Sequence, residues 1–387
     1  MEDCIVIGCG FAGSVIARHL AEKNKKVLII ERRNHIAGNM YDFRDENGIL
    51  VQKYGPHTFH TTNKKLYDYI NRFAEWVPFE LKCMTYIDGK FTPTPFNFQT
   101  IDDYYTFEEA YLLKKRIKEY YNGQDKTTIV EMLDCEDETI RSYAQFLYDK
   151  DYSLYTAKQW GISPKDIDIS VLKRVPVRLS YKNGYFDDEY QVMPKISFVN
   201  FFENILSHPN IEIRLNTEAK DVLEINTNSK FVKFDGKQVD IPVIYTGALD
   251  QLLDYKYGEL PYRSLRFEYH TINMTSYQEA PVVAYPQEKE FTRITEYTKL
   301  PVQMKNITKI AIEYPLQHNL AEKTEPYYPI LTDNSIGEFG KYRADLSDIE
   351  NLFLCGRLAD FKYYNMDQIL EKAMAMCDII DEWLGGH

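Results

Sequence analysis

A glycine-rich turn near the N-terminus constrains the fold of this chain more than any other feature. The apolar run at residues 4–7 predicts a buried strand, a G-x-G-x-x-G turn follows at residues 8–13, and a helix-forming run then reaches Glu22. In this motif the first glycine permits a tight turn, the second lets the backbone approach a pyrophosphate, and the third lets helix and strand pack closely. The phosphate lies at the positive end of the helix. We therefore expect a dinucleotide, bound at Gly8, Gly10, Phe11, Ala12 and Gly13.

An acidic residue at the end of the second predicted strand supports this expectation. The apolar run at residues 26–30 ends in Glu31, about 20 residues after the turn, where an acid can bond a ribose 2′-hydroxyl and disfavours a 2′-phosphate. Each feature alone also has a structural explanation, since the turn could bind nothing and Glu31 could be a solvated strand end. Together they favour a dinucleotide site.

Two segments indicate FAD rather than NAD. Residues 32–39 resemble the second phosphate and ribose segment of FAD-dependent enzymes of the amine-oxidase and desaturase type. Near the C-terminus, an apolar run at 351–355 leads into Gly-Arg, and helical apolar spacing begins at residue 366. Such a helix N-terminus can stabilise negative charge on a reduced flavin, although an ordinary α/β domain also ends in a core strand and helix. The expected cofactor contacts are Arg32, Asn39, Gly356, Arg357, Tyr364, Asn365 and Met366.

Composition argues against several classes of function. The 46 basic and 58 acidic side chains give a net charge of −12, which argues against a nucleic-acid partner. The six cysteines form no C-x-x-C pair and do not cluster with histidine, so we expect small buried side chains and no metal. Because the turn begins by residue 8 and no apolar run approaches about 18 residues, we expect no signal peptide, no membrane segment and a cytoplasmic protein.

The order of predicted elements indicates an α/β fold whose dinucleotide domain is interrupted. We expect a FAD-binding Rossmann-type domain with an inserted helical bundle and an inserted antiparallel β-sheet. The expected ranges are 1–80, 190–250 and 335–387 for the FAD-binding domain, 98–165 for the helical domain, and 80–98, 166–190 and 251–334 for the sheet and substrate domain.

Three local patterns define the expected helical insertion. Asp102 could cap its first helix, and residues 111–117 are amphipathic. The acidic run at 134–138 is typical of a solvated helix start rather than a metal site. Elsewhere, most of the 31 tyrosines are expected to be structural, although some can offer hydroxyls to sugars and phosphates.

Six further motifs occur in order along the chain. They are YGPHTFHT at 54–61, YTAKQWG at 155–161, RVPVR at 174–178 with Tyr185-Phe186, FTR at 291–293, EPYYP at 325–329, and GRL at 356–358 followed by YYNM at 363–366. Any one could arise by chance, but six in order with compatible spacing form a specific signal. The set resembles the motifs of bacterial UDP-galactopyranose mutases, and the resemblance runs from Cys4 to the C-terminal helix.

The resemblance implies a ring contraction without net redox change that still requires reduced FAD. UDP-galactopyranose and UDP-galactofuranose interconvert when flavin N5 attacks the anomeric carbon and expels UDP. The sugar opens to an iminium-type adduct and recloses through another hydroxyl, and UDP returns. A reductant or NAD(P)H must then reduce the flavin, although no second G-x-G-x-x-G is visible. Since the family often forms dimers, we expect a homodimer.

The resemblance also assigns roles to individual residues. Arg174 and Arg293 match paired arginines that hold the leaving diphosphate with bidentate contacts, Arg174 on a mobile loop that closes over the substrate. Trp160 and Tyr155, with Thr156 nearby, are expected to hold the uracil. The diphosphate is expected to be bound by the hydroxyls of Tyr185, Tyr328 and Tyr363. His57, His60 and Thr58 are expected beside the isoalloxazine, where an imidazole could move a proton. The expected substrate contacts are Tyr155, Thr156, Trp160, Arg174, Tyr185, Arg293, Tyr328 and Tyr363, and the expected catalytic residues are Arg174, Arg293 and His60.

Departures from the family pattern lie on the hexose side of the expected site. Asn365 stands where many members have Asp, and Ala284 stands where an Asn commonly faces the sugar. Asp151 or Tyr152, depending on alignment, replaces a small apolar or aromatic residue. These changes leave the sugar open, so a 6-deoxy or N-acetyl hexose on a nucleoside diphosphate is the closest alternative.

Two other functions remain open at this point. A flavin oxidase or desaturase acting on an amine or isoprenoid would share the FAD motif but would need net electron transfer and a long apolar channel. The paired arginines and Trp160 argue against it. The other is a flavin-binding protein without catalytic activity.

Overall fold

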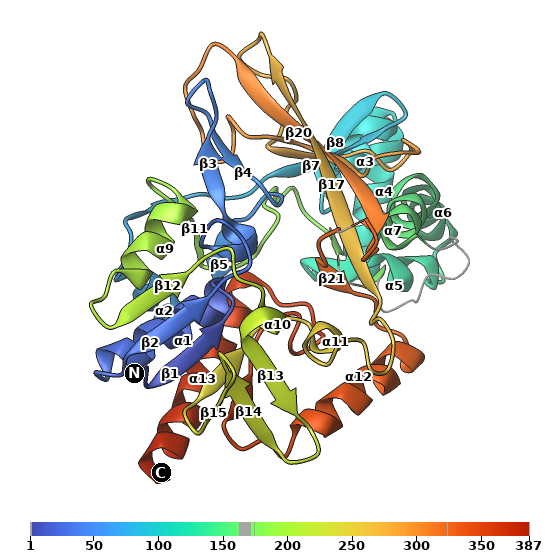
Figure 1. Ribbon diagram of the computed structural model, residues 1–387. Helices are drawn as coiled ribbons and strands as arrows, with labels where there is room; N and C mark the ends of the chain where they lie inside the picture. Colours follow the sequence, from blue (N-terminus) through green and yellow to red (C-terminus); the bar gives the residue numbers. More distant parts are fainter. Residues whose placement is uncertain (1, 162–171, 174, 323, 387) are drawn as a thin grey trace.

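The computed structural model describes residues 2–161, 172–173, 175–322 and 324–386. Two large sheets and a group of helices make up the molecule (Figure 1). The five-stranded sheet lies at the end that carries the N-terminus, and the long paired strands β17 (Tyr262–Ile272) and β20 (Thr308–Gln317) of the seven-stranded sheet extend away from it. Helices α3–α7 lie to one side of these two strands.

The five-stranded sheet is parallel throughout and has the strand order expected of a Rossmann-type unit. Its order is β12 (Ile211–Arg214), β2 (Val27–Ile30), β1 (Cys4–Ile7), β16 (Val243–Tyr245) and β22 (Leu352–Leu354). Fully apolar strands such as β1 and β2 are typical of parallel sheets that are covered on both faces. The expected strands at both ends and in the middle of the chain are therefore confirmed, and they meet in one sheet.

Alternate side chains of β1 enter two different cores. Cys4 and Val6 face a core shared with α1 (Phe11–Glu22), α9 (Phe198–Leu206) and α13 (Met366–Gly386). Ile5 and Ile7 face the other core, which includes β13 (Leu223–Asn226), β14 (Phe231–Phe234) and α12 (Asp333–Leu346). This alternation follows from the two-residue period of a strand. Helices α1 and α13, nearly 350 residues apart in the sequence, pack against each other.

The seven-stranded sheet is mostly antiparallel. Its order is β21 (Tyr328–Pro329), β17 (Tyr262–Ile272), β20 (Thr308–Gln317), β19 (Arg293–Glu296), β18 (Val282–Ala284), β7 (Cys83–Ile87) and β8 (Lys90–Thr94). One pair, β18 with β7, is parallel, so the expectation of a purely antiparallel sheet is wrong at this point. The long crossover between residues 87 and 282 allows this parallel pairing, which a short hairpin could not.

The helical part comprises α3 (Phe98–Tyr104), α4 (Phe107–Tyr120), α5 (Ile129–Leu133), α6 (Glu138–Leu147), the π-helix η2 (Tyr148–Tyr152) and α7 (Ser153–Trp160). Asp102 does not cap the first helix. The Asn97 side chain does so, and Asp102 lies inside α3, where it pairs with Lys114 and accepts a hydrogen bond from Tyr181. Asp137 caps α6, so the acidic run is a helix start as expected.

We expected segment 166–190 to join the large sheet, but its described part does not. Its strand β10 (Pro176–Arg178) pairs with β9 (Lys126–Thr128) of the helical part. The signal of alternating residues there identified a strand but could not identify its partner. The remaining short elements are η1 (Gly38–Met40), β3 (Asp42–Arg44), β4 (Leu50–Gln52), β5 (Phe59–Thr61), α2 (Lys64–Asn71), β6 (Trp76–Pro78), β11 (Tyr190–Pro194), α10 (Ala219–Val222), β15 (Lys237–Val239) and α11 (Leu249–Leu252).

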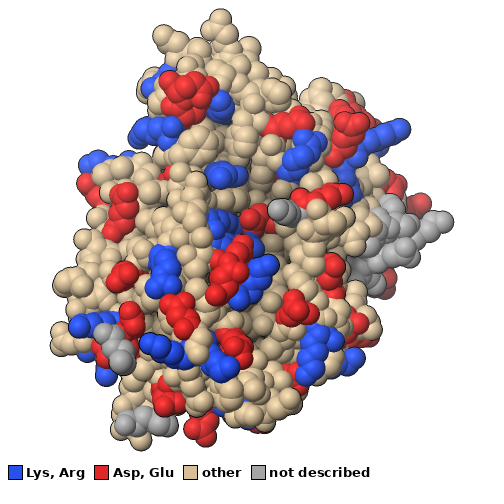
Figure 2. Space-filling model, viewed as in Figure 1, with Lys and Arg blue, Asp and Glu red and all other residues tan. Residues whose placement is uncertain are grey.

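All six cysteines are free and buried, as the sequence predicts, and burial raises the pKa of Cys9 to about 12. Acidic and basic side chains interleave over the face drawn in Figure 2. Within the described ranges, no cluster of three or more His, Cys, Asp or Glu could hold a metal ion. None of the described helices is both long and apolar enough to cross a bilayer.

Candidate functional site

The turn between β1 and α1 requires glycine at two positions, because the surrounding atoms leave no room for a side chain there. Gly8 has φ +105°, and a Cβ there would lie 2.0 Å from Thr246 Oγ1. A Cβ on Gly13 would lie 2.0 Å from the Gly8 carbonyl oxygen. Gly10 differs, because the nearest atom to its Cβ position is Gly38 Cα at 3.9 Å. The turn is therefore tightly packed on its protein side and open at Gly10.

A large cavity lies at the edge of the parallel sheet where the carboxyl ends of its strands meet. Most of the expected cofactor contacts line it, from both ends of the chain; Thr58 and Asn365 are not among its described lining residues. The expected residues in the lining are Gly8, Gly10, Phe11, Ala12, Gly13, Glu31, Arg32, Asn39, His57, Gly356, Arg357, Tyr364 and Met366.

Several lining residues were not predicted. Arg33, Thr217, Gly247, Pro326 and Tyr327 all border the cavity. Gly247 could have been predicted, because it follows a predicted strand whose end must reach the same sheet edge. Arg33, Pro326 and Tyr327 lie in segments that the sequence analysis singled out, but it assigned them no cofactor role. Thr217 lies on a loop without a comparable pattern.

Glu31 ties the turn to the end of β2. One carboxylate oxygen accepts a hydrogen bond of 2.8 Å from the Cys9 N–H, and the other accepts one of 2.9 Å from the Arg33 N–H. The residue is only 6% exposed, so its orientation is fixed. It faces the cavity with lone pairs still available to a ribose hydroxyl.

Two arginines form one wall of the cavity. Arg33 donates to Glu325 and to Asn39, both at 3.0 Å, and its guanidinium lies 4.3 Å from the centre of the Tyr54 ring. Arg32 also pairs with Glu325. Glu325 comes from the loop before β21, so this cluster joins the sheet insertion to the parallel-sheet domain. It places two cations beside the open turn.

Arg357 and two tyrosines form a cluster at another part of the cavity. Arg357 lines the cavity and donates a 2.7 Å hydrogen bond to the Tyr364 carbonyl oxygen. Its guanidinium lies 5.5 Å from the Tyr328 ring centre and 5.0 Å from that of Tyr363, distances typical of cation–π contacts. The two rings are 5.6 Å apart. The structure thus brings together three residues that the sequence placed at the diphosphate and flavin.

Arg293 projects from β19 and is held by a carboxylate that the sequence analysis missed. Its Nε and Nη2 lie 2.8 and 2.7 Å from Glu313 Oε2, and the Thr292 hydroxyl donates to Glu313 Oε1 at 3.0 Å. The Glu313 side chain is 2% exposed. Burial raises the pKa of Tyr155 and of Tyr328, and in both cases the nearby Arg293 cation opposes the rise. Glu313 is a single acidic residue on the otherwise mostly apolar strand at 308–317, and this pattern could have identified it from the sequence.

The two histidines of the first motif differ in position. His57 lines the cavity, and its Nδ1 donates to the Gly55 carbonyl oxygen at 2.9 Å. Burial and the nearby Arg357 cation lower the pKa of His57 to about 4, so the ring is neutral at pH 7. His60 instead stacks on Phe186 at 3.6 Å and lies 3.0 Å from Asp188. Of the two, His57 has the position expected beside a cofactor.

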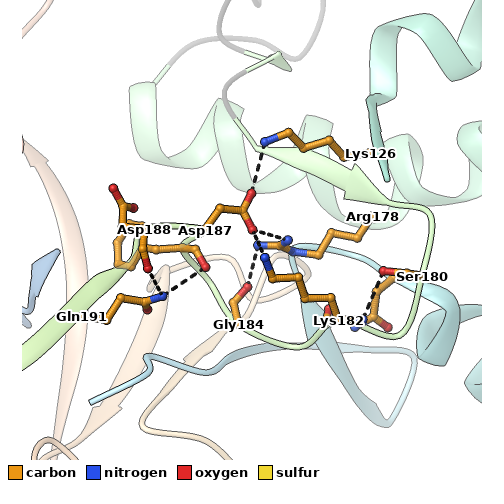
Figure 3. A network of polar contacts seen from close by, with 10 residues as sticks. Lys126, Arg178, Ser180, Lys182, Gly184, Asp187, Asp188 and Gln191 are labelled. Atoms are coloured by element: carbon orange, nitrogen blue, oxygen red, sulfur yellow. Dashed lines mark hydrogen bonds and ion pairs between the residues drawn. The ribbon is translucent and has the colours of Figure 1, made fainter. Parts of the chain in front are cut away.

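A network of charges holds the loop that carries Tyr185 (Figure 3). Buried Arg178 pairs with Asp187 at 2.7 Å and donates to the Gly184 carbonyl oxygen at 2.8 Å. Lys126 and Lys182 also pair with Asp187. The Tyr185 N–H itself donates to the Leu81 carbonyl oxygen. The loop is therefore fixed from several sides.

Helix α7 carries the expected uracil contacts Tyr155, Thr156 and Trp160. It ends at Gly161 in the left-handed conformation, and Arg263 donates to the Gln159 carbonyl oxygen at 2.7 Å. This cation at the helix C-terminus complements the helix dipole. The side chain of Trp160 and all of Arg174 lie outside the part of the chain that the structure describes.

The chain is similar to known proteins over almost its whole length. A family model described as UDP-galactopyranose mutase matches residues 150–363, and one described as NAD(P)-binding Rossmann-like domain matches residues 6–73. The dTDP-fucopyranose mutase of Escherichia coli is 34% identical, with 97% of each chain covered. A probable UDP-galactopyranose mutase of Klebsiella pneumoniae is 33% identical, with 97% of this chain and 94% of its own covered.

Solved structures agree in fold. The crystal structure of a reduced UDP-galactopyranose mutase matches with a TM-score of 0.73 at 17% identity and covers 100% of this chain and 96% of its own. A putative protoporphyrinogen oxidase from Exiguobacterium matches with a TM-score of 0.61 at 12% identity over 99% of both chains, so the fold alone does not separate mutases from oxidases. The family model and the full-length relatives make that distinction: this chain belongs to the UDP-galactopyranose mutase family of enzymes.

Proposed function

We propose that this protein uses reduced FAD to interconvert UDP-galactopyranose and UDP-galactofuranose without net redox change. The observation that carries the proposal is the adjacency of two sites. Arg357 lines the dinucleotide cavity with its open glycine turn and also contacts the rings of Tyr328 and Tyr363. The Arg293 cation is close enough to Tyr328 to oppose the rise that burial causes in the pKa of its hydroxyl. An oxidase of amines or isoprenoids has no need for such cations beside its flavin.

The residues of the cavity fit FAD. Helix α1 begins at Gly10 without a side-chain cap and without acidic residues in its first turn, so its N–H groups are available to a pyrophosphate. Arg32 adds positive charge on that wall, and Glu31 offers acceptors to a ribose. Gly356 and the start of α13 at Met366 border the place left for the ring system.

When bound, reduced FAD supplies the nucleophile for the anomeric carbon of the sugar. The side chains then have three tasks. Arg174 and Arg293 neutralise the diphosphate as it departs. Arg357 adds positive charge at the edge of the cofactor cavity. The hydroxyls of Tyr185, Tyr328 and Tyr363 orient the diphosphate. Because His57 Nδ1 donates to Gly55, its Nε2 is the nitrogen free to accept a proton as the ring opens.

The test is isomerisation of UDP-galactofuranose by the purified holoprotein, with and without dithionite, followed by chromatography. We expect UDP-galactopyranose only under reducing conditions. Arg293→Ala should reduce kcat/KM at least 100-fold, whereas Arg266→Ala, at an exposed arginine of β17, should leave it unchanged. Bleaching of the oxidised flavin by substrate without oxygen would instead support an oxidase.

A second candidate keeps the reaction and changes the sugar. Asn365 and Ala284 stand where other residues are expected on the hexose side, and one relative is named a dTDP-fucopyranose mutase. Turnover of a 6-deoxy or N-acetyl hexose far above that of UDP-galactose would favour this candidate. We further propose a cytoplasmic homodimer reduced by NAD(P)H or another reductant. Light scattering and anaerobic titration with NAD(P)H test the last two points.

A further inference from the structure

One row of side chains crosses the seven-stranded sheet through the proposed substrate site. In register, Thr85 of β7 pairs with Ala284 of β18, Ala284 pairs with Arg293 of β19, and Arg293 pairs with Glu313 of β20. Side chains in register on adjacent strands lie on the same face of a sheet. The Cα atoms of Thr85 and Arg293 are about 10 Å apart, because adjacent strands are about 4.8 Å apart.

Asp151 lies over the Thr85 end of this row. The Thr85 hydroxyl donates to Asp151 Oδ1 at 2.8 Å, and Thr85 is fully buried. Oδ2 of Asp151 accepts no hydrogen bond from any side chain or backbone group in the described ranges. Lys158, on the next helix, donates instead to the carbonyl oxygens of Tyr285 and Glu288. One oxygen of this carboxylate therefore has no donor among the residues that the structure describes.

The backbone around Asp151 is unusual in the same place. Asp151 lies in η2, and π-turns of this kind occur frequently at functional sites. Desolvation by the surrounding protein raises the pKa of Asp151 to about 6, yet the residue is half-buried and Oδ2 is not one of the buried side-chain atoms without a partner. Oδ2 is therefore accessible to a ligand, and a hydroxyl group that donates to it would complete the hydrogen bonding of the carboxylate.

The residue between the two ends of the row is small. Ala284 presents only a methyl group between Thr85 and Arg293. Tyr155 lies one helical turn after Asp151. The charges of both Asp151 and Arg293 act on the pKa of its hydroxyl, so Tyr155 lies near both groups. A hexose whose diphosphate is held at Arg293 can thus lie over Ala284 and reach Asp151 with a hydroxyl group.

We infer that Asp151 determines sugar specificity by accepting a hydrogen bond from a hexose hydroxyl remote from the diphosphate. The inference rests on the proposed function and deepens it. A carboxylate in this role favours a fully hydroxylated hexose over a hexose that places a methyl group or an acetamido carbonyl against it. Sites built to bond a substrate hydroxyl reject analogues that lack it far more strongly than apolar pockets reject an added group.

The test compares kcat/KM for UDP-galactopyranose with kcat/KM for its 6-deoxy, 2-acetamido and 4-deoxy analogues. The unmodified enzyme should prefer the hydroxylated sugar by roughly 100-fold or more over at least one analogue. Asp151→Leu should reduce that preference at least tenfold. Asp149→Asn, at an exposed position of the same π-helix, should leave it unchanged.

Further measurements separate a specificity role from misfolding. The dissociation constant of UDP alone should be the same for Asp151→Leu and the unmodified enzyme, because UDP lacks the sugar. Asp151→Asn should retain part of the preference, since its amide oxygen still accepts. Equal turnover of all four sugars by the unmodified enzyme, or an unchanged preference in Asp151→Leu, would overturn the inference. If no nucleotide sugar isomerises at all, the proposed function fails first.

Discussion

Substituting alanine at Gly10 or at Gly13 should separate cofactor binding from folding. In Gly13→Ala, the new methyl carbon would lie 2.0 Å from the Gly8 carbonyl oxygen and 3.1 Å from Val6 Cγ1. Real Cβ atoms stay at least 3.0 Å from other atoms, so α1 must move from β1 by about 1 Å. Overpacking of this kind costs about 1–3 kcal/mol and sometimes more. We expect Gly13→Ala to lose both stability and cofactor.

Gly10→Ala should behave differently. The nearest atom to its Cβ is 3.9 Å away, and its φ of −84° suits alanine. The free energy of unfolding of the apoprotein should therefore change by less than about 1 kcal/mol. The methyl group does enter the cavity where a pyrophosphate must approach the backbone, so FAD affinity should fall at least about tenfold, or 1.4 kcal/mol.

The assay is urea unfolding of the apoprotein, combined with FAD titration followed by flavin fluorescence. Gly337→Ala in α12 is the matched control, because its methyl group meets nothing within 4 Å. It should stabilise the helix by about 0.5–1 kcal/mol and leave FAD affinity unchanged. Unaltered FAD binding by Gly10→Ala would refute our account of the turn.

Three further predictions follow from the charged groups. The pKa of His57 falls from 6.5 to about 4 on folding, so as the pH drops from 6.5 to 4 the unfolded chain takes up a proton first and stability is lost. His57→Gln should reduce that loss in apoprotein urea unfolding at pH 7 and pH 4.5, and an identical loss would contradict the assignment. Glu313→Gln removes the charge that holds Arg293. The loss of this charged hydrogen bond should cost about 1.5–3 kcal/mol, which is a roughly 10- to 100-fold lower kcat/KM. Glu268→Gln, at an exposed position, is the control, and equal kinetics in the two variants would exclude a positioning role for Glu313. Arg178→Ala should lower the free energy of unfolding by about 1–3 kcal/mol. The control Lys64→Ala, at an exposed ion pair, should change it by less than about 0.5 kcal/mol. Similar values for the two variants would refute the role of the loop network.

The parallel sheet could be predicted from the sequence because its signals are local. Its strands β1, β2, β16 and β22 are short apolar runs, β12 alternates apolar and charged residues, and the turn at Gly8 places β1 beside a helix. The partners of other strands could not be predicted in the same way. Pairing of β10 with β9, and of β18 with β7 in parallel, depends on where the intervening helices carry the chain.

The candidate site shows the same division. Gly10, Glu31 and Arg357 follow motifs, and the structure brings all three to one cavity. Glu313 was missed, and Glu325 was recognised only as part of the EPYYP motif, because their roles depend on contacts with Arg293 and Arg33 that the fold creates. A carboxylate that holds an arginine leaves no spacing pattern of its own, since only the fold determines which acid lies opposite which base.

The packing of α1 against α13 has a consequence for biosynthesis. A ribosome makes the glycine turn well before the edge strand β22 and helix α13, yet the cavity needs all of them. The nascent polypeptide therefore cannot capture its cofactor until α13 has been made. Because a bound ligand favours the native state by mass action, flavin supply in the cell should limit how much newly made enzyme survives.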